Sequence, residues 1–183
     1  MNNKLFIISG PSGSGKTSLM RQIMSSEIVS VTTREPRNGE IEGVDYYFID
    51  IDQFMALYHS GELVEYANNF GNYYGITKGE INKKLNNNHT FAIVTAHGKD
   101  QLTKYYPNCV KIFLYASMDD AYLNMLSRGD SPGKALDRLM SYEQEMKTRH
   151  DYDYVVKNIR GQMLHTLRIL RGIINAEISK GDK

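Results

Sequence analysis

A glycine-rich segment near the amino end carries the clearest chemistry in the sequence. Residues 10–17 read G-P-S-G-S-G-K-T, between an apolar run and a segment of helical period. Glycines let the backbone curl so that its N–H groups, together with the start of the following helix, can bind phosphate. Lys16 would place its charge on the β and γ phosphates, and the Thr17 hydroxyl would ligate Mg²⁺. The predicted phosphate-binding residues for ATP are Gly10, Pro11, Ser12, Gly13, Ser14, Gly15, Lys16, Thr17 and Ser18.

Two arginines, Arg34 and Arg37, suggest a second phosphate site. They lie three residues apart beside Thr32 and Thr33, and Pro36 keeps the chain between them extended. Each guanidinium can bind two phosphate oxygens, so the pair would suit a monophosphate. Taken alone, the segment is more typical of a solvated charged loop than of a phosphate clamp.

Further motifs make the sequence resemble the guanylate kinase family. The resemblance extends from Leu5 to about Asn158, and T-T-R-E-P-R together with G-N-Y-Y-G is its most specific part. The matching segments are 30–40, 43–46, 61–67, 70–75, Arg128 with Gly129, Arg138, and 152–154 followed by Asn158.

The resemblance implies a GMP-binding role for residues of the second site. Arg34, Arg37, Tyr46 and Tyr74 would grip the phosphate of GMP. Ser30 and Glu65 would read the guanine edge, because a carboxylate can accept from N1–H and the exocyclic amine together. The predicted GMP-binding residues are Ser30, Arg34, Arg37, Glu40, Tyr46, Glu65, Tyr74, Ile76 and Thr95.

On the ATP side, the resemblance implies a lid. Arg128 and Arg138 would close over the ATP phosphates and neutralise charge in the transition state. Asn158 would lie near the adenine. The predicted catalytic residues are Lys16, Arg34, Arg128 and Arg138, and the predicted metal ligand is Thr17.

Four positions, and the length of one link, depart from the family pattern. Ile76 replaces a Ser or Thr that helps to read guanine, and Asn124 replaces a lid arginine. Ile93 and Thr95 stand where two aspartates are usual, one associated with the metal region and one with the base. The link between the first helix and Ser30 is also shorter than typical. His97 is a candidate replacement ligand, although a lone histidine beside a glycine is more often structural.

The elements around these residues alternate between strand and helix. Apolar runs at 5–8, 91–94 and 110–114 predict buried strands, and helical patterns between them predict a parallel sheet. Capping boxes predict helix starts at Thr77 and Ser117, and the last helix covers about 163–179. The α/β fold implied by the resemblance is of the P-loop NTPase type, a five-stranded parallel sheet with helices on both faces. We expect one domain, 1–183, with its core at 1–33 and 78–183, an inserted nucleotide-binding lobe at about 34–77, and a lid at about 128–137 that begins in a loop at 128–133.

Composition limits the partners. Lys plus Arg is 22 and Asp plus Glu is 21, so no net charge favours a nucleic acid, and no apolar run is long enough for a membrane helix. The single cysteine, Cys109, fits a reducing compartment, and we expect a cytoplasmic protein. The expected partners are small nucleotides, and the oligomeric state stays open.

These observations predict a nucleoside monophosphate kinase that transfers the γ-phosphoryl group of ATP, with Mg²⁺, to GMP or dGMP. One alternative is a kinase of the same fold with altered base preference or low activity. Another is a non-catalytic interaction module, but such a module would not need an intact phosphate loop with Lys16.

Overall fold

The computed structural model describes residues 3–69 and 71–181; Phe70, the first residue of one predicted motif, lies outside them. The main sheet has four parallel strands in the order β6-β1-β7-β8. They are β1 (Leu5–Ser9), β6 (Thr90–Ile93), β7 (Val110–Tyr115) and β8 (Tyr154–Lys157). The three apolar runs are therefore strands, as predicted.

The predicted fifth strand is not formed. In its place, one parallel bridge joins Glu27 to Phe91 beside β6. The chain leaves α1 only a few residues earlier and enters a second sheet at Val31, so it has too little length for a full strand here.

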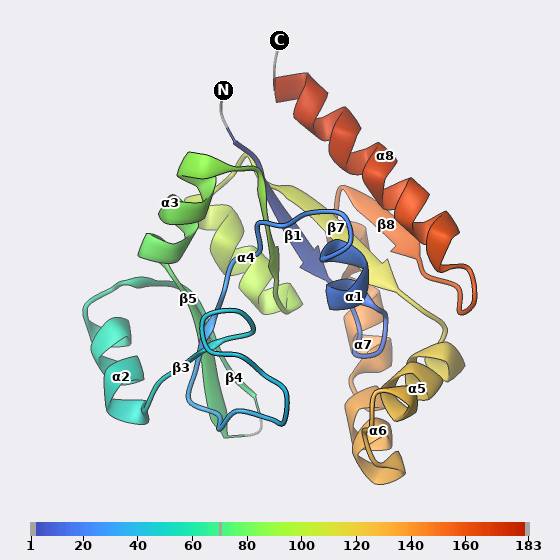
Figure 1. Cartoon of the computed structure of the whole chain (residues 1–183), viewed down its shortest axis with the longest axis horizontal. Helices are drawn as coiled ribbons and strands as arrows, with labels where there is room; N and C mark the ends of the chain where they lie inside the picture. Colours follow the sequence, from blue (N-terminus) through green and yellow to red (C-terminus); the bar gives the residue numbers. More distant parts are fainter. Residues whose placement is uncertain (1–2, 70, 182–183) are drawn as a thin grey trace.

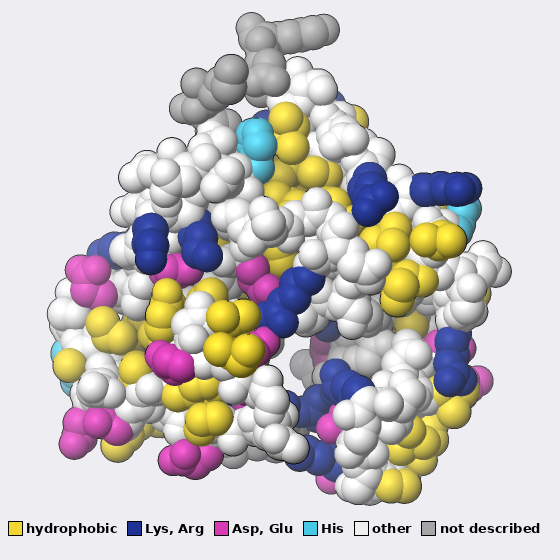
Figure 2. All heavy atoms as spheres, viewed as in Figure 1, with side chains coloured by type: hydrophobic (Ala, Val, Ile, Leu, Met, Phe, Trp, Pro, Cys, Tyr) yellow, Lys and Arg dark blue, Asp and Glu magenta, His cyan; other side chains and the backbone are white. Residues whose placement is uncertain are grey.

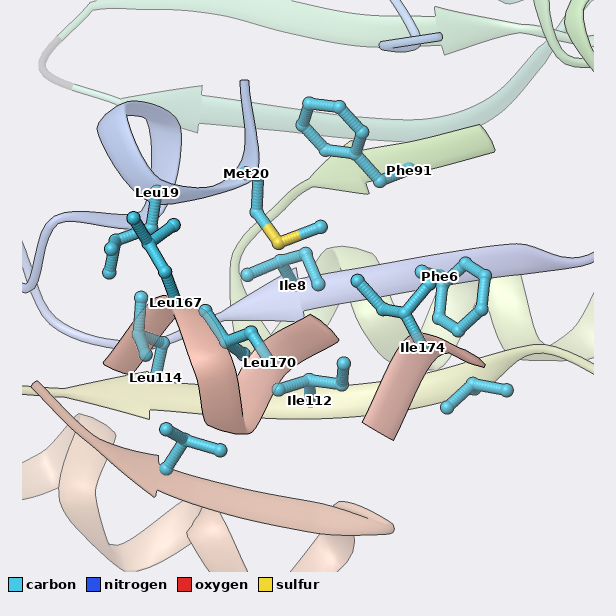
Figure 3. Packing of buried hydrophobic residues seen from close by; sticks show 12 residues of the cluster. Phe6, Ile8, Leu19, Met20, Phe91, Ile112, Leu114, Leu167, Leu170 and Ile174 are labelled. Atoms are coloured by element: carbon cyan, nitrogen blue, oxygen red, sulfur yellow. The ribbon is translucent and has the colours of Figure 1, made fainter. Parts of the chain in front are cut away.

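Two hydrophobic clusters hold helices on opposite faces of the main sheet. Phe6 and Ile8 of β1 pack toward α1 (Lys16–Met20) and α8 (Met163–Gly181), as Figures 1 and 3 show. Leu5 and Ile7 point the other way and pack against residues of α3 (Lys78–Asn87) and α4 (Ala96–Tyr105). Strand residues alternate between faces, so a fully apolar strand is expected when both faces are covered.

A second sheet forms a separate lobe in the region predicted to bind the monophosphate. Its strand order is β3-β2-β5-β4, comprising β2 (Val31–Thr32), β3 (Tyr47–Phe48), β4 (Leu63–Asn69) and β5 (Asn72–Thr77), with α2 (Ile51–His59) packed on it. A small cluster around Val31, Phe54 and Leu63 holds it together. The sheet already begins at Val31, a few residues before the expected start of the lobe.

The region predicted as a lid lies across from this lobe (Figure 1). It is built from α5 (Met118–Ser127) and α6 (Pro132–Leu139), and α7 (Tyr142–Lys147) with the 3₁₀ turn η1 (Thr148–Asp151) leads back to the sheet. Figure 2 shows a hollow between lobe and lid. The loop before α6 is shorter than predicted, because Ser131 caps the helix and Pro132 occupies its first turn.

Local helix signals are confirmed. The Thr77 hydroxyl accepts from the Glu80 N–H at 3.2 Å, and the Ser117 hydroxyl accepts from the Asp120 N–H at 3.2 Å. These two caps start α3 and α5 at the predicted residues.

Candidate active site

The phosphate loop is shaped by glycines that no other residue could replace. Gly10 and Gly13 have φ of 136° and 78°. A Cβ on Gly10 would lie 1.9 Å from the Leu114 carbonyl oxygen, and one on Gly13 would lie 2.3 Å from that of Ala121. The loop is therefore packed against the end of β7 and the first turns of α5.

Lys16 closes this loop from within. Its Nζ donates to the Gly10 and Pro11 carbonyls at 2.6 and 2.9 Å. Although the residue as a whole keeps partial exposure, burial of the ammonium lowers the pKa of Lys16 to about 8; Glu145 opposes this shift, and the charges of Arg128 and Arg138 add to it. Bound phosphate would offset this desolvation and repulsion.

The other predicted ATP residues surround Lys16. Thr17 and Ser18 lie exposed at the start of α1. Asn158 follows β8 and donates through Nδ2 to the Ser14 carbonyl at 3.1 Å, while its Oδ1 accepts from Thr166 at 3.0 Å. In this structure the Asn158 amide therefore supports the loop backbone.

The arginine clamp is held by a carboxylate. Arg34 donates from Nη2 to both oxygens of Glu40, at 2.8 and 2.9 Å, and Glu40 also accepts from the Arg37 backbone N–H at 2.8 Å. The guanidinium lies 5.4 Å from the ring centre of Tyr46, whose ring meets Tyr74 edge to face at 5.9 Å. Three predicted phosphate-binding side chains, those of Arg34, Tyr46 and Tyr74, are thus neighbours, and Arg37 joins them through its backbone N–H.

Charge and hydrogen bonding prepare Arg34 for an anion. Burial alone would lower the pKa of Arg34, but hydrogen bonds with Glu40 and Tyr74 raise it above its ordinary value. Its Nε is buried and has no hydrogen-bond partner among the described residues. A ligand would reach this donor only after the Arg34 side chain moved away from Glu40.

The two lid arginines share a carboxylate in the same manner. Arg128 donates to Asp130 Oδ2 from Nε and Nη2 at 2.9 and 2.7 Å, and Arg138 Nη1 lies 3.9 Å from the same oxygen. Burial lowers the pKa of Arg138, Asp130 opposes this, and the positive charges of Arg128 and Arg37 lower it further. Cations of the lid and the lobe therefore act on one another across the hollow, where Figure 2 shows Lys and Arg side chains gathered.

Asp130 was not predicted from the sequence. Its only signal was the R-x-D spacing after Arg128, which is too common in loops to indicate a role. Glu145 of α7, whose charge acts on Lys16, was missed as well, because its proximity to the loop arises only in the folded chain.

Glu65, the residue predicted to bind the guanine base, is buried and closely packed. The residue is 5% exposed, and burial raises its pKa to about 7. A Cβ on Gly98 of α4 would come within 2.5 Å of Glu65 Oε1. Ser30 lies partly exposed just before β2. Gly98 thus makes room for the Glu65 carboxylate at the start of α4.

Residues at the departing positions take structural places. Ile76 lies opposite Glu65 in the β4–β5 register, but its side chain is 1% exposed and packs in the core cluster with Ile81. Thr95 is exposed and caps α4, its Oγ1 accepting from the Gly98 N–H at 3.1 Å. Ile93 packs partly buried against the core cluster on the α1 and α8 side.

His97 is exposed and forms a 2.8 Å hydrogen bond with Gln101, one helical turn on. Within residues 3–69 and 71–181, no three His, Cys, Asp or Glu side chains cluster closely enough to hold a metal ion. Nor does any helix in these ranges combine the length and apolarity needed to cross a membrane.

Comparison with known proteins identifies the family to which this chain belongs. The family model described as guanylate kinase matches residues 2–177. The chain belongs to the guanylate kinase family. The guanylate kinase of Oceanobacillus iheyensis is 35% identical over 187 aligned positions, covering 98% of this chain and 90% of that protein. That of Methylobacillus flagellatus is 33% identical, covering 100% and 94%.

A solved structure supports the family fold. The crystal structure of guanylate kinase from Anaplasma phagocytophilum superposes with a TM-score of 0.73 at 28% identity, covering 96% of this chain and 86% of that one. The predicted family and the P-loop α/β fold are therefore confirmed, with one strand fewer in the main sheet than expected.

Proposed function

We propose that this protein transfers the γ-phosphoryl group of ATP to GMP, and also to dGMP. The observation that carries the proposal is the meeting of three cationic groups around one hollow: the phosphate loop with Lys16, the lobe clamp with Arg37, and the lid with Arg138. A single phosphate ligand would need only one of them. Two phosphate-bearing substrates held end to end would need all three.

Phosphoryl transfer requires alignment and charge neutralisation more than covalent chemistry from the protein. Arg34, Arg37, Tyr46 and Tyr74 hold the GMP phosphate so that one oxygen faces the γ-phosphorus of ATP in line. Lys16, Arg128 and Arg138 stabilise the negative charge that spreads over the transferring group. The acceptor oxygen forms the new P–O bond as the bond to the β-phosphate oxygen breaks, giving GDP and ADP.

Closure of lobe and lid supplies the remaining contribution. The hollow between them is open to water in this structure (Figure 2). Bringing α6 toward the lobe excludes water from the transferring group, which suppresses hydrolysis of ATP. Asp130 and Glu40 release their arginines to the phosphates at this step.

The residues at the phosphate loop fit Mg²⁺ brought in with ATP. Thr17 is exposed in the first turn of α1, and no described residue forms a hydrogen bond with its hydroxyl. That oxygen would hold the ion together with the ATP phosphates, and the ion, when bound, would neutralise charge on the β and γ oxygens.

A kinase with weaker discrimination among purines is the second candidate. It is favoured by the packing of Ile76 in the core and by the uncharged Thr95, which leave Glu65 and Ser30 as the base readers. Losing a neutral and a charge-assisted hydrogen bond would weaken guanine binding by about 2–4 kcal/mol. Adenine would still be rejected, because it lacks the N1–H group from which Glu65 would accept a hydrogen bond.

A coupled assay with ATP and a panel of nucleoside monophosphates tests the proposal. We expect turnover of GMP and dGMP, a raised KM for GMP, a narrow margin over IMP, and no turnover of AMP, CMP or UMP. Preference for any of the last three would overturn the guanine assignment. A cytoplasmic location and the absence of nucleic-acid and membrane partners stay predictions.

A further inference from the structure

The lid helix α5 is joined directly to the phosphate loop. Asn124 of α5 donates from Nδ2 to the Gly13 carbonyl at 2.9 Å. Gly13 itself has no room for a side chain, because a Cβ there would lie 2.3 Å from the Ala121 carbonyl oxygen of α5. α5 and the loop therefore meet in close contact, with one side-chain hydrogen bond between them.

Four carbonyls of the loop accept hydrogen bonds from side chains, and that of Gly13 is one of them. Lys16 takes those of Gly10 and Pro11, and Asn158 takes that of Ser14. A peptide unit is planar and trans, so fixing the direction of its C=O fixes its N–H on the opposite side. Asn124 thus sets the orientation of the Gly13–Ser14 peptide.

The N–H of that peptide makes only a long hydrogen bond within the loop. The Ser14 N–H donates to the Pro11 carbonyl at 3.3 Å, at the long end of the range for such a bond. A phosphate oxygen would be a stronger acceptor than this carbonyl. The bond from Asn124 stays in place in either case, because it acts on the other end of the peptide.

We propose that Asn124 is a positioning residue for the phosphoryl donor. It locks the Gly13–Ser14 peptide in the orientation that presents the Ser14 N–H to the ATP phosphates. It also ties the loop to α5, which ends one residue before Arg128, so that the lid and the phosphate site keep one relative geometry. This role differs from that of the lid arginine usual in the family at this position, since the Asn124 amide is committed to the loop backbone. The proposal rests on ATP being the donor, as set out above.

Two variants separate positioning from charge. Asn124→Ala removes the hydrogen bond without adding charge, and we expect a rise of about fivefold in the KM for Mg-ATP, with the KM for GMP unchanged within about twofold. Asn124→Asp also faces a carboxylate toward the Gly13 carbonyl, and we expect a larger rise, about tenfold. Ser127→Ala and Ser127→Asp are matched controls, because the exposed Ser127 hydroxyl has, among the described residues, only the Asn124 backbone carbonyl as a partner. Both controls should leave the KM for ATP within about twofold.

Calorimetry with Mg-tripolyphosphate supplies a readout that a merely structural role would not move. This probe has no adenine, so a loss of about fivefold in its affinity for Asn124→Ala, at a temperature where circular dichroism shows a folded protein, supports the proposal. Unchanged tripolyphosphate affinity, or equal weakening of tripolyphosphate and GMP, overturns it. If the wild type fails to phosphorylate GMP, the proposed function fails, but tripolyphosphate binding still decides the role of Asn124.

Discussion

The two phosphate sites are held in shape by different means. In the phosphate loop the backbone itself is fixed, by glycine conformations and by side chains that bond its carbonyls, among them Lys16 and Asn158. In the lobe the binding groups are side chains, and Arg34 is held by an ion pair with Glu40. One site is prepared by peptide geometry, and the other by a carboxylate paired with the arginine that we propose binds phosphate.

This difference indicates how each substrate meets the protein. ATP phosphates would enter a loop whose carbonyls are already held by side chains, so little reorganisation would oppose binding. The GMP phosphate must draw Arg34 away from Glu40, and the free energy of that ion pair offsets part of the gain. The acceptor site is therefore the one whose side chains rearrange with ligand.

Lys16→Met should have the largest effect. Methionine cannot place charge on the transferring phosphoryl group, so kcat/KM should fall at least about a hundredfold, or about 3 kcal/mol. Loss of two bonds to loop carbonyls should also lower stability by about 1–2 kcal/mol. Steady-state kinetics and thermal melts would measure both effects.

Lys104→Met is the control for this change, since Lys104 is exposed near the end of α4. It should keep wild-type kinetics. Near-wild-type turnover by folded Lys16→Met would show that the loop does not carry the reaction.

Arg34→Ala should act on the acceptor side alone. We expect GMP affinity to fall by about 2 kcal/mol, roughly 30-fold, at the low end for a bidentate contact because free Arg34 is already paired with Glu40. ATP affinity should stay within about twofold, and calorimetry of both ligands would show the split. The exposed Arg160, changed to alanine, is the matched control. Equal weakening of ATP and GMP would mean that the two sites are assigned wrongly.

The pH dependence of Glu65 sharpens the comparison within the lobe. Burial raises its pKa to about 7, and only the ionised carboxylate can accept from both guanine donors. GMP affinity should therefore rise about tenfold between pH 6 and pH 8, measured by calorimetry. Glu65→Gln should reduce this rise. The pH dependence of GMP affinity that remains in the variant comes from the GMP phosphate, which titrates near pH 6. If GMP affinity rises just as much with pH in Glu65→Gln, Glu65 does not read the base.

Stability should change in the opposite direction with pH. An acid whose pKa is raised on folding binds its proton more tightly in the folded state, so its contribution is most favourable below about pH 4 and declines as pH rises to 7. For Glu65 the full decline is about 3 kcal/mol. Urea unfolding of wild type and Glu65→Gln at pH 5 and pH 8 would measure it, and equal pH dependence in the two would contradict the assignment.

Thr95→Asp should have the smallest effect. Aspartate is also a good helix cap, so α4 should keep its start, and the new carboxylate could accept from the guanine amine. We expect kcat/KM for GMP over IMP to rise by about threefold to tenfold at pH 8. A fall in GMP activity would show that position 95 does not face the base.

Ile76→Ser is not a suitable companion to this change. Ile76 is 1% exposed in the core, so the substitution would cost about 2–4 kcal/mol of stability in addition to any gain in base reading.

Some parts of the site could be predicted because their signals are local. The phosphate-loop motif consists of glycines and a lysine within eight consecutive residues, and the caps at Thr77 and Ser117 each involve a bond over three residues. The burial of Ile76 in the core could not be predicted. A resemblance assigns a residue to a position in the chain but does not say on which face of a strand its side chain lies. A bulge between Leu63 and Glu65 sets which β4 residues meet β5, and no residue type announces it.

The sequence by itself determined the chemistry of the two phosphate sites, because glycines, a lysine and paired arginines bind phosphate through properties of those residues. The tertiary structure decided what holds them. Asn124 meets Gly13 across 111 positions of the chain, and Glu65 meets Gly98 only where α4 packs on β4. Such contacts depend on how elements pack, and packing is the sum of many weak interactions that no short pattern encodes.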